Sequence, residues 1–216
     1  MREFMTFVAP ILAAILAGYL IGSIPVAWIV CKWVTGNDIR NLGSGNVGVM
    51  NTAINVTRWA ALIVFLAEAG KGLLAALIPR LFGANELIVC IAILSTVIGT
   101  RWSVWLGFSG GRGNTAGLAG LALVAWQACL ATLLVWLLFR ILFKKSFIAT
   151  RLTFWLLPVI VAIATHSLVV TLLGFGLSLI YLTTQEEWSD DHLMIKKRWP
   201  SLIAFLVSPP RGHKPR

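Results

Sequence analysis

Long apolar stretches with few charged residues dominate this chain and restrict what it can fold into. Of its 216 residues, 58% are hydrophobic, and several stretches exceed the roughly 18 apolar residues that read as a membrane span. In lipid, backbone N–H and C=O groups must be satisfied internally, so such spans form helices. We therefore predict an all-α, polytopic integral membrane protein with about five to seven transmembrane or half-membrane helices and glycine-rich interfacial loops. The expected spans are residues 7–34, 55–78, 87–100, 118–143 and a region at 152–182.

One membrane domain is expected at 1–185, followed by a basic, partly amphipathic or disordered tail at 186–216. The net charge is +10. Because the basic residues fall mostly at span ends and in the tail, they indicate contact with anionic lipid headgroups and argue against a nucleic acid partner. The region 152–182 crosses either once or twice, since Thr165-His166-Ser167 interrupts it. The side on which the basic cluster Arg140–Arg151 lies therefore stays open.

A glycine-rich segment, Asn41–Asn51, lies between the first two spans. Its glycines allow backbone amides to turn inward, and a helix opening near Asn51 would point free N–H groups at the same place. These features favour binding of a phosphate or carboxylate; the alternative is an ordinary turn at the membrane surface. Arg40, directly before the segment, either adds a positive charge to that site or is one more surface arginine. The candidate residues in the segment are Gly43, Ser44, Gly45, Asn46, Gly48 and Asn51.

Two further clusters carry charge close to the membrane. Glu68 and Lys71 lie on one face of the second span, where ionisable groups are either functional or form a structural ion pair. Arg112 stands in a second glycine cluster, where Asn114 or Thr115 is expected to cap the next helix. An arginine in such a loop suits phosphate; the alternative is a solvated arginine on a flexible loop. The loop glycines concerned are Gly110, Gly111 and Gly113.

The remaining polar residues suggest no covalent or metal chemistry. The sequence shows no carboxylate dyad, no convincing Ser-His-Asp set and no cluster with metal-ligand spacing, so catalysis would depend on positioning and charge stabilisation. The cysteines are expected to be buried and unpaired; they are Cys31, Cys90 and Cys129. Gly22-Ser23-Ile24-Pro25 predicts a kink in the first span, and His166 is expected to be a polar turn residue. No cofactor is expected.

Three ordered motifs resemble the bacterial membrane glycerol-3-phosphate acyltransferases that use acyl phosphate, the PlsY family. Leu42–Asn51, preceded by Asp38-Ile39-Arg40, resembles the first family signature. Glu68-Ala-Gly-Lys71-Gly72 resembles the acidic-x-x-Lys-Gly motif, and Gly107–Gly113 resembles the Gly-Phe-x-Gly-Gly-Lys-Gly loop. The early Gly22–Pro25 also fits. The match covers roughly the first 120 residues in order and spacing, and it is the combination that is specific.

The resemblance implies an acyltransferase-like domain at 1–185 that moves a fatty acyl group from acyl phosphate to the 1-hydroxyl of glycerol 3-phosphate. The products would be lysophosphatidic acid and phosphate, formed without metal, acyl-enzyme or an obligate protein partner, in phospholipid biosynthesis. The protein would lie in the bacterial inner membrane with its site toward the cytoplasm. Ser44 and Asn46 would lie near the reacting groups, while Lys71 and Arg112 would balance the two phosphates.

The sequence departs from the family pattern at several positions. Thr100 stands where the family usually has histidine, and Arg112 replaces a lysine. Ile54 occupies the place of an arginine, for which Arg58, one turn later, is a candidate substitute. The C-terminal His-x-x-Asn motif has no match, because the corresponding stretch is Thr183–Glu186. The alternative is therefore a relative that binds a phosphorylated lipid or metabolite with altered or no catalysis; a small transporter ranks last.

Overall fold

The computed structural model describes residues 2–184, and within this range every regular element is helical. The helices are α1 (Arg2–Ser23), α2 (Val26–Thr35), α3 (Val49–Asn55), α4 (Arg58–Leu81), α5 (Glu86–Arg101), α6 (Asn114–Val124), α7 (Trp126–Phe143), α8 (Ser146–Thr165) and α9 (Leu168–Thr184). Single 3₁₀ turns cover Ile39–Asn41 and Val104–Leu106. Five stretches are long and apolar enough to cross a membrane: Val8–Thr35, Arg58–Leu81, Glu86–Leu106, Trp126–Phe143 and Ser146–Thr165. The predicted tail, 186–216, lies outside the described residues.

The first predicted span is confirmed, and its interruption is larger than a bend. Helix α1 ends at Ser23 and α2 begins at Val26, so that Ile24 and Pro25 lie outside both helices. Proline has no N–H to continue the helical bonding. The N–H of Val26, which would bond to the Gly22 carbonyl in a continuous helix, bonds to the Ile24 carbonyl at 3.0 Å instead. The Gly22 carbonyl therefore has no helical donor and bonds to side chains from other helices.

The fourth predicted span was wrong as a single helix. Residues 118–143 fall in two helices, α6 and α7, which are separated at Ala125. The region 152–182 also forms two helices, α8 and α9. Between them His166 adopts a left-handed conformation with φ of 51°, and its N–H closes the end of α8 on the Ala162 carbonyl. The prediction of a polar turn at His166 is confirmed.

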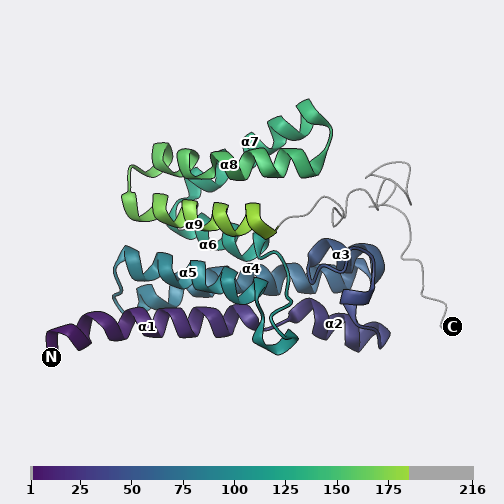
Figure 1. Cartoon of the computed structure of the whole chain (residues 1–216), viewed down its shortest axis with the longest axis horizontal. Helices are drawn as coiled ribbons and strands as arrows, with labels where there is room; N and C mark the ends of the chain where they lie inside the picture. The colour runs from purple at the N-terminus through teal and green to yellow at the C-terminus, as the bar shows by residue number, and fades with distance from the viewer. Residues whose placement is uncertain (1, 185–216) are drawn as a thin grey trace.

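Helix α5 lies at the centre of the bundle and packs against α1, α4, α6 and α9. Helices α1 and α5 approach closely because Gly22 and Gly99 leave no Cβ between the two backbones. Helices α7, α8 and α9 form a second group on one side (Figure 1), with α8 packed between α7 and α9. Much of α7 is exposed on the outside of the bundle, where its apolar side chains suit contact with lipid.

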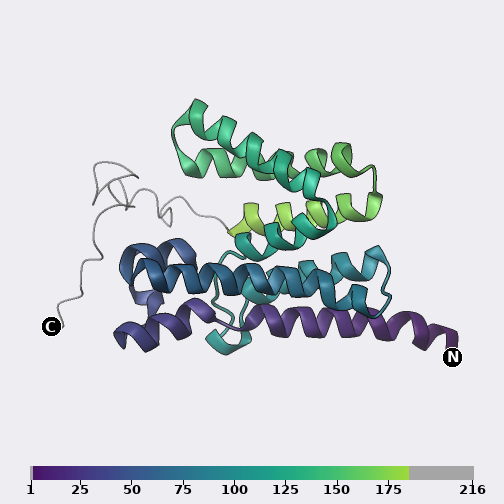
Figure 2. The same cartoon turned by 180° about the vertical axis from the view of Figure 1, so that it is seen from behind.

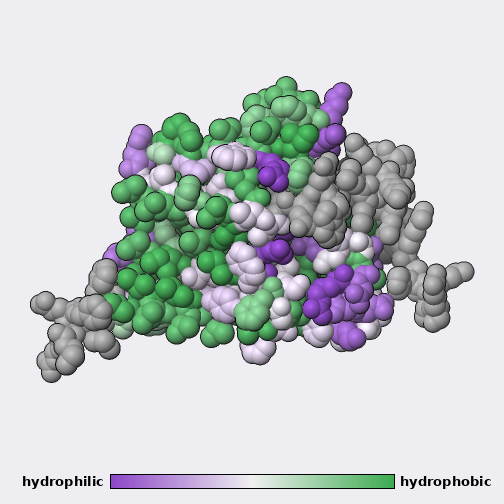
Figure 3. Space-filling model, viewed as in Figure 1, coloured by the Kyte–Doolittle hydropathy of each residue, from purple (hydrophilic) through white to green (hydrophobic). Residues whose placement is uncertain are grey.

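Both glycine-rich loops lie at the same end of the bundle as α2 and α3. The turn between α7 and α8, and the last turn of α9, lie toward this end as well (Figures 1 and 2). This arrangement shows on which side of the membrane domain the basic turn after α7 lies, which the sequence had left open. Because α8 and α9 run in opposite directions, the Lys144–Lys145 turn and Thr184 are on one side of the membrane domain. Figure 3 shows hydrophilic residues gathered near this end, next to a largely hydrophobic surface over the rest of that face.

Candidate active site

A cavity of about 290 Å³ opens where the two glycine-rich loops meet α4 and α5. This volume is at the lower end of the range for small-molecule sites. Its walls come from the first loop with the start of α3, from one residue each of α4 and α5, and from the second loop with the start of α6. The lining residues are Asn46, Val47, Gly48, Val49, Met50, Glu68, Thr100, Arg112, Gly113, Asn114 and Thr115.

Six of the residues predicted from the sequence meet in this cavity: Asn46, Gly48, Glu68, Arg112, Gly113 and Thr115. A smaller recess of about 10 Å³ beside it is lined by Lys71, Gly110 and Gly111, together with Glu68 and Thr100. The other predicted residues line neither space. They are Arg40, Gly43, Ser44, Gly45, Asn51 and Arg58.

The buried side chain of Asn51 holds the first glycine loop in shape. Its amide nitrogen donates to the carbonyls of Ile39, Leu42 and Asn46, at 3.3, 3.0 and 2.9 Å. Its amide oxygen accepts from Nδ2 of Asn55 at 2.7 Å. Asn51 is fully buried, so its role in the described structure is to tie the two halves of the loop together.

The conformation of the same loop depends on glycine at two points. Gly43 and Gly45 have φ values of 57° and 71°, in the left-handed region that favours glycine. A Cβ at Gly43 would also overlap the amide groups of Asn51 and Asn55. Between these glycines, Ser44 is buried, and its hydroxyl accepts a long hydrogen bond of 3.4 Å from the backbone N–H of Asn46.

The second glycine loop is anchored to the end of α5 and leads directly into α6. The backbone N–H groups of Gly110 and Gly111 donate to the carbonyls of Arg101 and Thr100, at 2.9 and 3.0 Å. Gly113, with φ of 73°, is the N-cap of α6, and no side chain caps this helix. The predicted cap by Asn114 or Thr115 was therefore wrong.

The uncapped start of α6 gives the cavity an anion-binding wall. The first N–H groups of a helix have no partner within the helix, and its N-terminus carries a partial positive charge. Asn114 and Thr115 belong to this first turn, and both line the cavity. Arg112 lines it as well and adds a full positive charge. This combination of a guanidinium group and helix amides suits a phosphate group.

Glu68 and Lys71 form a buried ion pair on α4, with 2.7 Å between Oε1 and Nζ. Lys71 Nζ also donates to the carbonyls of Ile24, at 2.6 Å, and Gly22, at 3.2 Å. Both carbonyls belong to the interruption between α1 and α2. The break caused by Pro25 thus supplies two acceptors for the lysine, and it joins α1 to α4 beneath the cavity.

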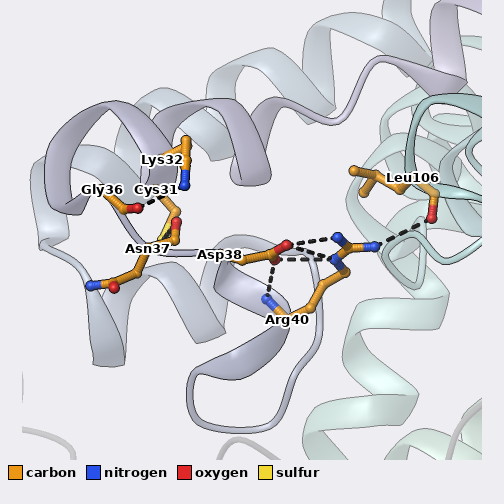
Figure 4. Close-up of polar contacts among 7 residues, drawn as sticks. All are labelled: Cys31, Lys32, Gly36, Asn37, Asp38, Arg40 and Leu106. Atoms are coloured by element: carbon orange, nitrogen blue, oxygen red, sulfur yellow. Dashed lines mark hydrogen bonds and ion pairs between the residues drawn. The ribbon is translucent and has the colours of Figure 1, made fainter.

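Arg40 forms a bidentate ion pair with Asp38 outside the cavity (Figure 4). Its Nη2 lies 2.6 Å from Oδ2 of Asp38, and its Nη1 donates to the carbonyl of Leu106 at 3.3 Å. The pair therefore connects the first loop to the second. Hydrogen bonds from Arg40 hold the pKa of Asp38 well below its usual value. The second predicted arginine, Arg58, is the first residue of α4 and also lies outside the lining set.

Sequence reasoning did not assign Thr100 or Asn114 to the site. Thr100 Oγ1 donates to the carbonyls of Thr96 and Gly22, at 2.9 and 3.2 Å, so this residue also contacts the interruption after α1. The sequence signal for Thr100 was its place where the related family usually has histidine. In residues 2–184, no group of three or more His, Cys, Asp or Glu side chains is arranged to hold a metal ion.

Comparison with known proteins shows the family to which the sequence is related. The family model for glycerol-3-phosphate acyltransferase matches residues 12–189. A glycerol-3-phosphate acyltransferase of Gluconobacter oxydans is 35% identical over 212 residues, which cover 97% of this chain and 94% of that protein. One of Prochlorococcus marinus (strain MIT 9215) is 37% identical over 135 residues, 62% of this chain and 68% of that protein.

The fold also matches a solved structure. The crystal structure of PlsY, an integral membrane glycerol 3-phosphate acyltransferase in its glycerol 3-phosphate form, superposes with a TM-score of 0.71. The match covers 87% of this chain and 90% of that chain at 24% sequence identity, and it supports the all-helical membrane fold. With the family match over most of its length, the chain belongs to the glycerol-3-phosphate acyltransferase family.

Proposed function

We propose that this protein transfers a fatty acyl group from acyl phosphate to the 1-hydroxyl of glycerol 3-phosphate. Membership of the family supports acylation of glycerol 3-phosphate in phospholipid synthesis. The observation that carries the proposal is the cavity between two glycine-rich loops, one of which ends in an uncapped helix beside Arg112. Two phosphate-bearing substrates need two such anion-binding walls at the membrane surface.

The proposed reaction is a direct transfer. The 1-hydroxyl oxygen bonds to the acyl carbonyl carbon, the bond from that carbon to the phosphate oxygen breaks, and the hydroxyl proton leaves with the phosphate. Arg112 and the first amides of α6 hold one phosphate, while Asn46 and the backbone at Gly48 face the other. Ser44 is assigned near the reacting groups on the family resemblance, and its burial supports a fixed orientation of the loop. The protein contributes positioning and charge stabilisation.

We further propose that the site faces the cytoplasm from the bacterial inner membrane. The end of the bundle that carries the site is rich in basic residues, as expected of a cytoplasmic side. The basic residues on elements at this end are Lys32, Arg40, Arg58, Arg101, Arg112, Lys144 and Lys145. At the other end, Arg80 near the end of α4 is followed by Glu86 at the start of α5. Substituted-cysteine labelling in intact cells, at an added cysteine in place of Asn37, tests this orientation.

The test of the reaction uses the full-length protein in detergent or lipid, with acyl phosphate and glycerol 3-phosphate added. Release of phosphate together with lysophosphatidic acid, identified by mass, is the expected result. Arg112→Gln should lower kcat/KM by at least about tenfold, because a charge-assisted contact to phosphate is lost. Arg80→Gln is the matched control, since Arg80 bonds to the carbonyl of Leu123 away from the cavity.

Other outcomes would change the proposal. Phosphate release without lysophosphatidic acid would point to water or a different acceptor. Neither product from a folded sample would refute the reaction, and thermal stabilisation by glycerol 3-phosphate in that sample would indicate a binding protein instead.

A further inference from the structure

Only one member of the buried ion pair on α4 reaches the larger cavity. Lys71 lines only the small recess, whereas Glu68 lines both the recess and the 290 Å³ cavity. An ammonium group has three N–H donors, and Lys71 Nζ has three acceptors within 3.2 Å: two backbone carbonyls and Oε1 of Glu68. Its hydrogen-bonding capacity is therefore used within the protein.

The carboxylate of Glu68 can still accept further hydrogen bonds. Its Oε1 accepts from Lys71 at 2.7 Å, and a carboxylate has a second oxygen with its own lone pairs. Among residues 2–184, no donor to this second oxygen, Oε2, is found. Although the residue is only 7% exposed, its side chain contributes to the cavity wall. An ion-paired carboxylate is an acceptor only, so the group that it fits is a hydroxyl or another N–H or O–H donor.

The cavity thus has two chemically different walls. Arg112 and the start of α6 suit a phosphate, while Glu68 repels a phosphate and suits a hydroxyl. A polyol phosphate carries both a phosphate and a hydroxyl group. Because each wall suits only one of these groups, the two walls hold the molecule in one orientation. We infer that Glu68 is a specificity-determining residue that accepts a hydrogen bond from the 2-hydroxyl of glycerol 3-phosphate, and that Lys71 positions its carboxylate. This inference rests on the proposed function, and it assigns Lys71 to positioning in place of direct contact with phosphate.

Of the two hydroxyl groups of glycerol 3-phosphate, the 2-hydroxyl is the better hydrogen-bond partner for Glu68. It keeps its proton throughout the proposed reaction, so a fixed acceptor can hold it from binding to product. The 1-hydroxyl must instead approach the acyl carbon and give up its proton to the phosphate. Holding the 2-hydroxyl at Glu68 and the phosphate at Arg112 fixes the acceptor at two points and leaves the 1-hydroxyl to react.

A cycle that combines an enzyme variant with a truncated substrate tests this assignment. The two acceptors are glycerol 3-phosphate and 3-hydroxypropyl phosphate, which lacks the 2-hydroxyl. Wild-type protein should prefer glycerol 3-phosphate by about 10- to 100-fold in kcat/KM, as expected for a hydrogen bond to a charged group. In Glu68→Gln the preference should fall to about threefold or less. Glu86→Gln, the same change about 21 Å away along α5 from Thr100, should retain the full preference.

The ratio of kcat/KM for the two acceptors separates a specificity role of Glu68 from a structural one. Disturbing the ion pair alone would lower turnover of both acceptors by the same factor, and an unchanged preference in Glu68→Gln would overturn the inference. If that variant does not fold, Glu68→Asp keeps the charge near Lys71 but withdraws it from the cavity, and the preference should fall likewise. Binding of the two acceptors, measured by calorimetry, gives the same cycle without turnover. A sample that transfers no acyl group would refute the proposed reaction, while the binding ratio would still decide the role of Glu68.

Discussion

Replacing Asn51 by aspartate should unfold the first glycine loop, although the two side chains have nearly the same shape. In the structure, the Asn51 amide nitrogen faces the carbonyls of Ile39, Leu42 and Asn46, within 3.3 Å. Aspartate places a carboxylate oxygen there, which cannot donate. Its charge would also lie against carbonyl oxygens in a fully buried position.

The expected loss of stability follows from the bonds that disappear. The amide nitrogen has two hydrogens, so about two net hydrogen bonds of roughly 1 kcal/mol each are lost, and buried carbonyls left without donors add to this. We expect Asn51→Asp to lower the free energy of unfolding by about 2–4 kcal/mol. For a chain of this length each kcal/mol corresponds to about 2–4 °C in Tm, so the fall in Tm should be roughly 4–16 °C. Acyl transfer should fall at least about tenfold, because Asn46 and Gly48 would no longer be held at the cavity.

Thermal unfolding in one detergent and steady-state acyl transfer, measured on the same preparations, test this expectation. Asn37→Asp is the matched control, because Asn37 is exposed in the connection between α2 and the first loop. It should unfold within about 1 °C of the wild type. If Asn51→Asp also stays within 1 °C and keeps its activity, the amide does not hold the loop and the reasoning fails.

Three further substitutions test other contacts. Lys71→Met leaves a buried carboxylate and two carbonyls without their donor, so stability should fall by about 3–5 kcal/mol in chemical or thermal unfolding. Gly72→Ala places a Cβ against the backbone of α6 and should lower stability by about 1–3 kcal/mol, whereas Gly70→Ala, with open space around it, should be neutral or slightly stabilising. Because bonding to Arg40 lowers the pKa of Asp38, that pair stabilises the fold above about pH 4 and less as the pH falls further. Asp38→Asn should therefore lower Tm by about 1–3 °C near pH 6, with a smaller difference below pH 4.

The membrane helices could be predicted largely from the sequence because lipid permits so few alternatives. An apolar stretch of sufficient length must become a helix, and Pro25 marked the break in the first one. The break at Ala125 had no such signal, since neither proline nor glycine stands beside it. It separates α6, which packs closely on α4, from α7 on the outer side of the bundle. The break at Ala125 depends on packing between segments that are distant in the sequence. It could not be predicted from the hydrophobicity of the stretch alone.

At the site, the sequence indicated which segments meet but not how each side chain is used. Glycine and asparagine content pointed to the loops, while the structure shows that Asn51 bonds to the loop itself. Arg40 was one candidate for the anion site, yet it bonds to Asp38, two residues earlier. The partners of Lys71 at Gly22 and Ile24 lie 49 and 47 residues away in the chain. Spacing within one helix could predict the Glu68 contact but could not predict these.

The charges around the cavity explain why the loops matter as much as the basic side chains. With Lys71 bonded to Glu68 and to backbone carbonyls, these two charges balance each other beneath the cavity. Arg112 is then the cationic side chain among the described residues that line it. One arginine cannot neutralise two phosphate groups, so under the proposed reaction the phosphate that does not meet Arg112 and α6 must depend on Asn46 and the backbone amides of the first loop. Amides hold their positions only if the loops are rigid. The buried bonds of Asn51 and the anchoring of Gly110 and Gly111 on α5 supply that rigidity.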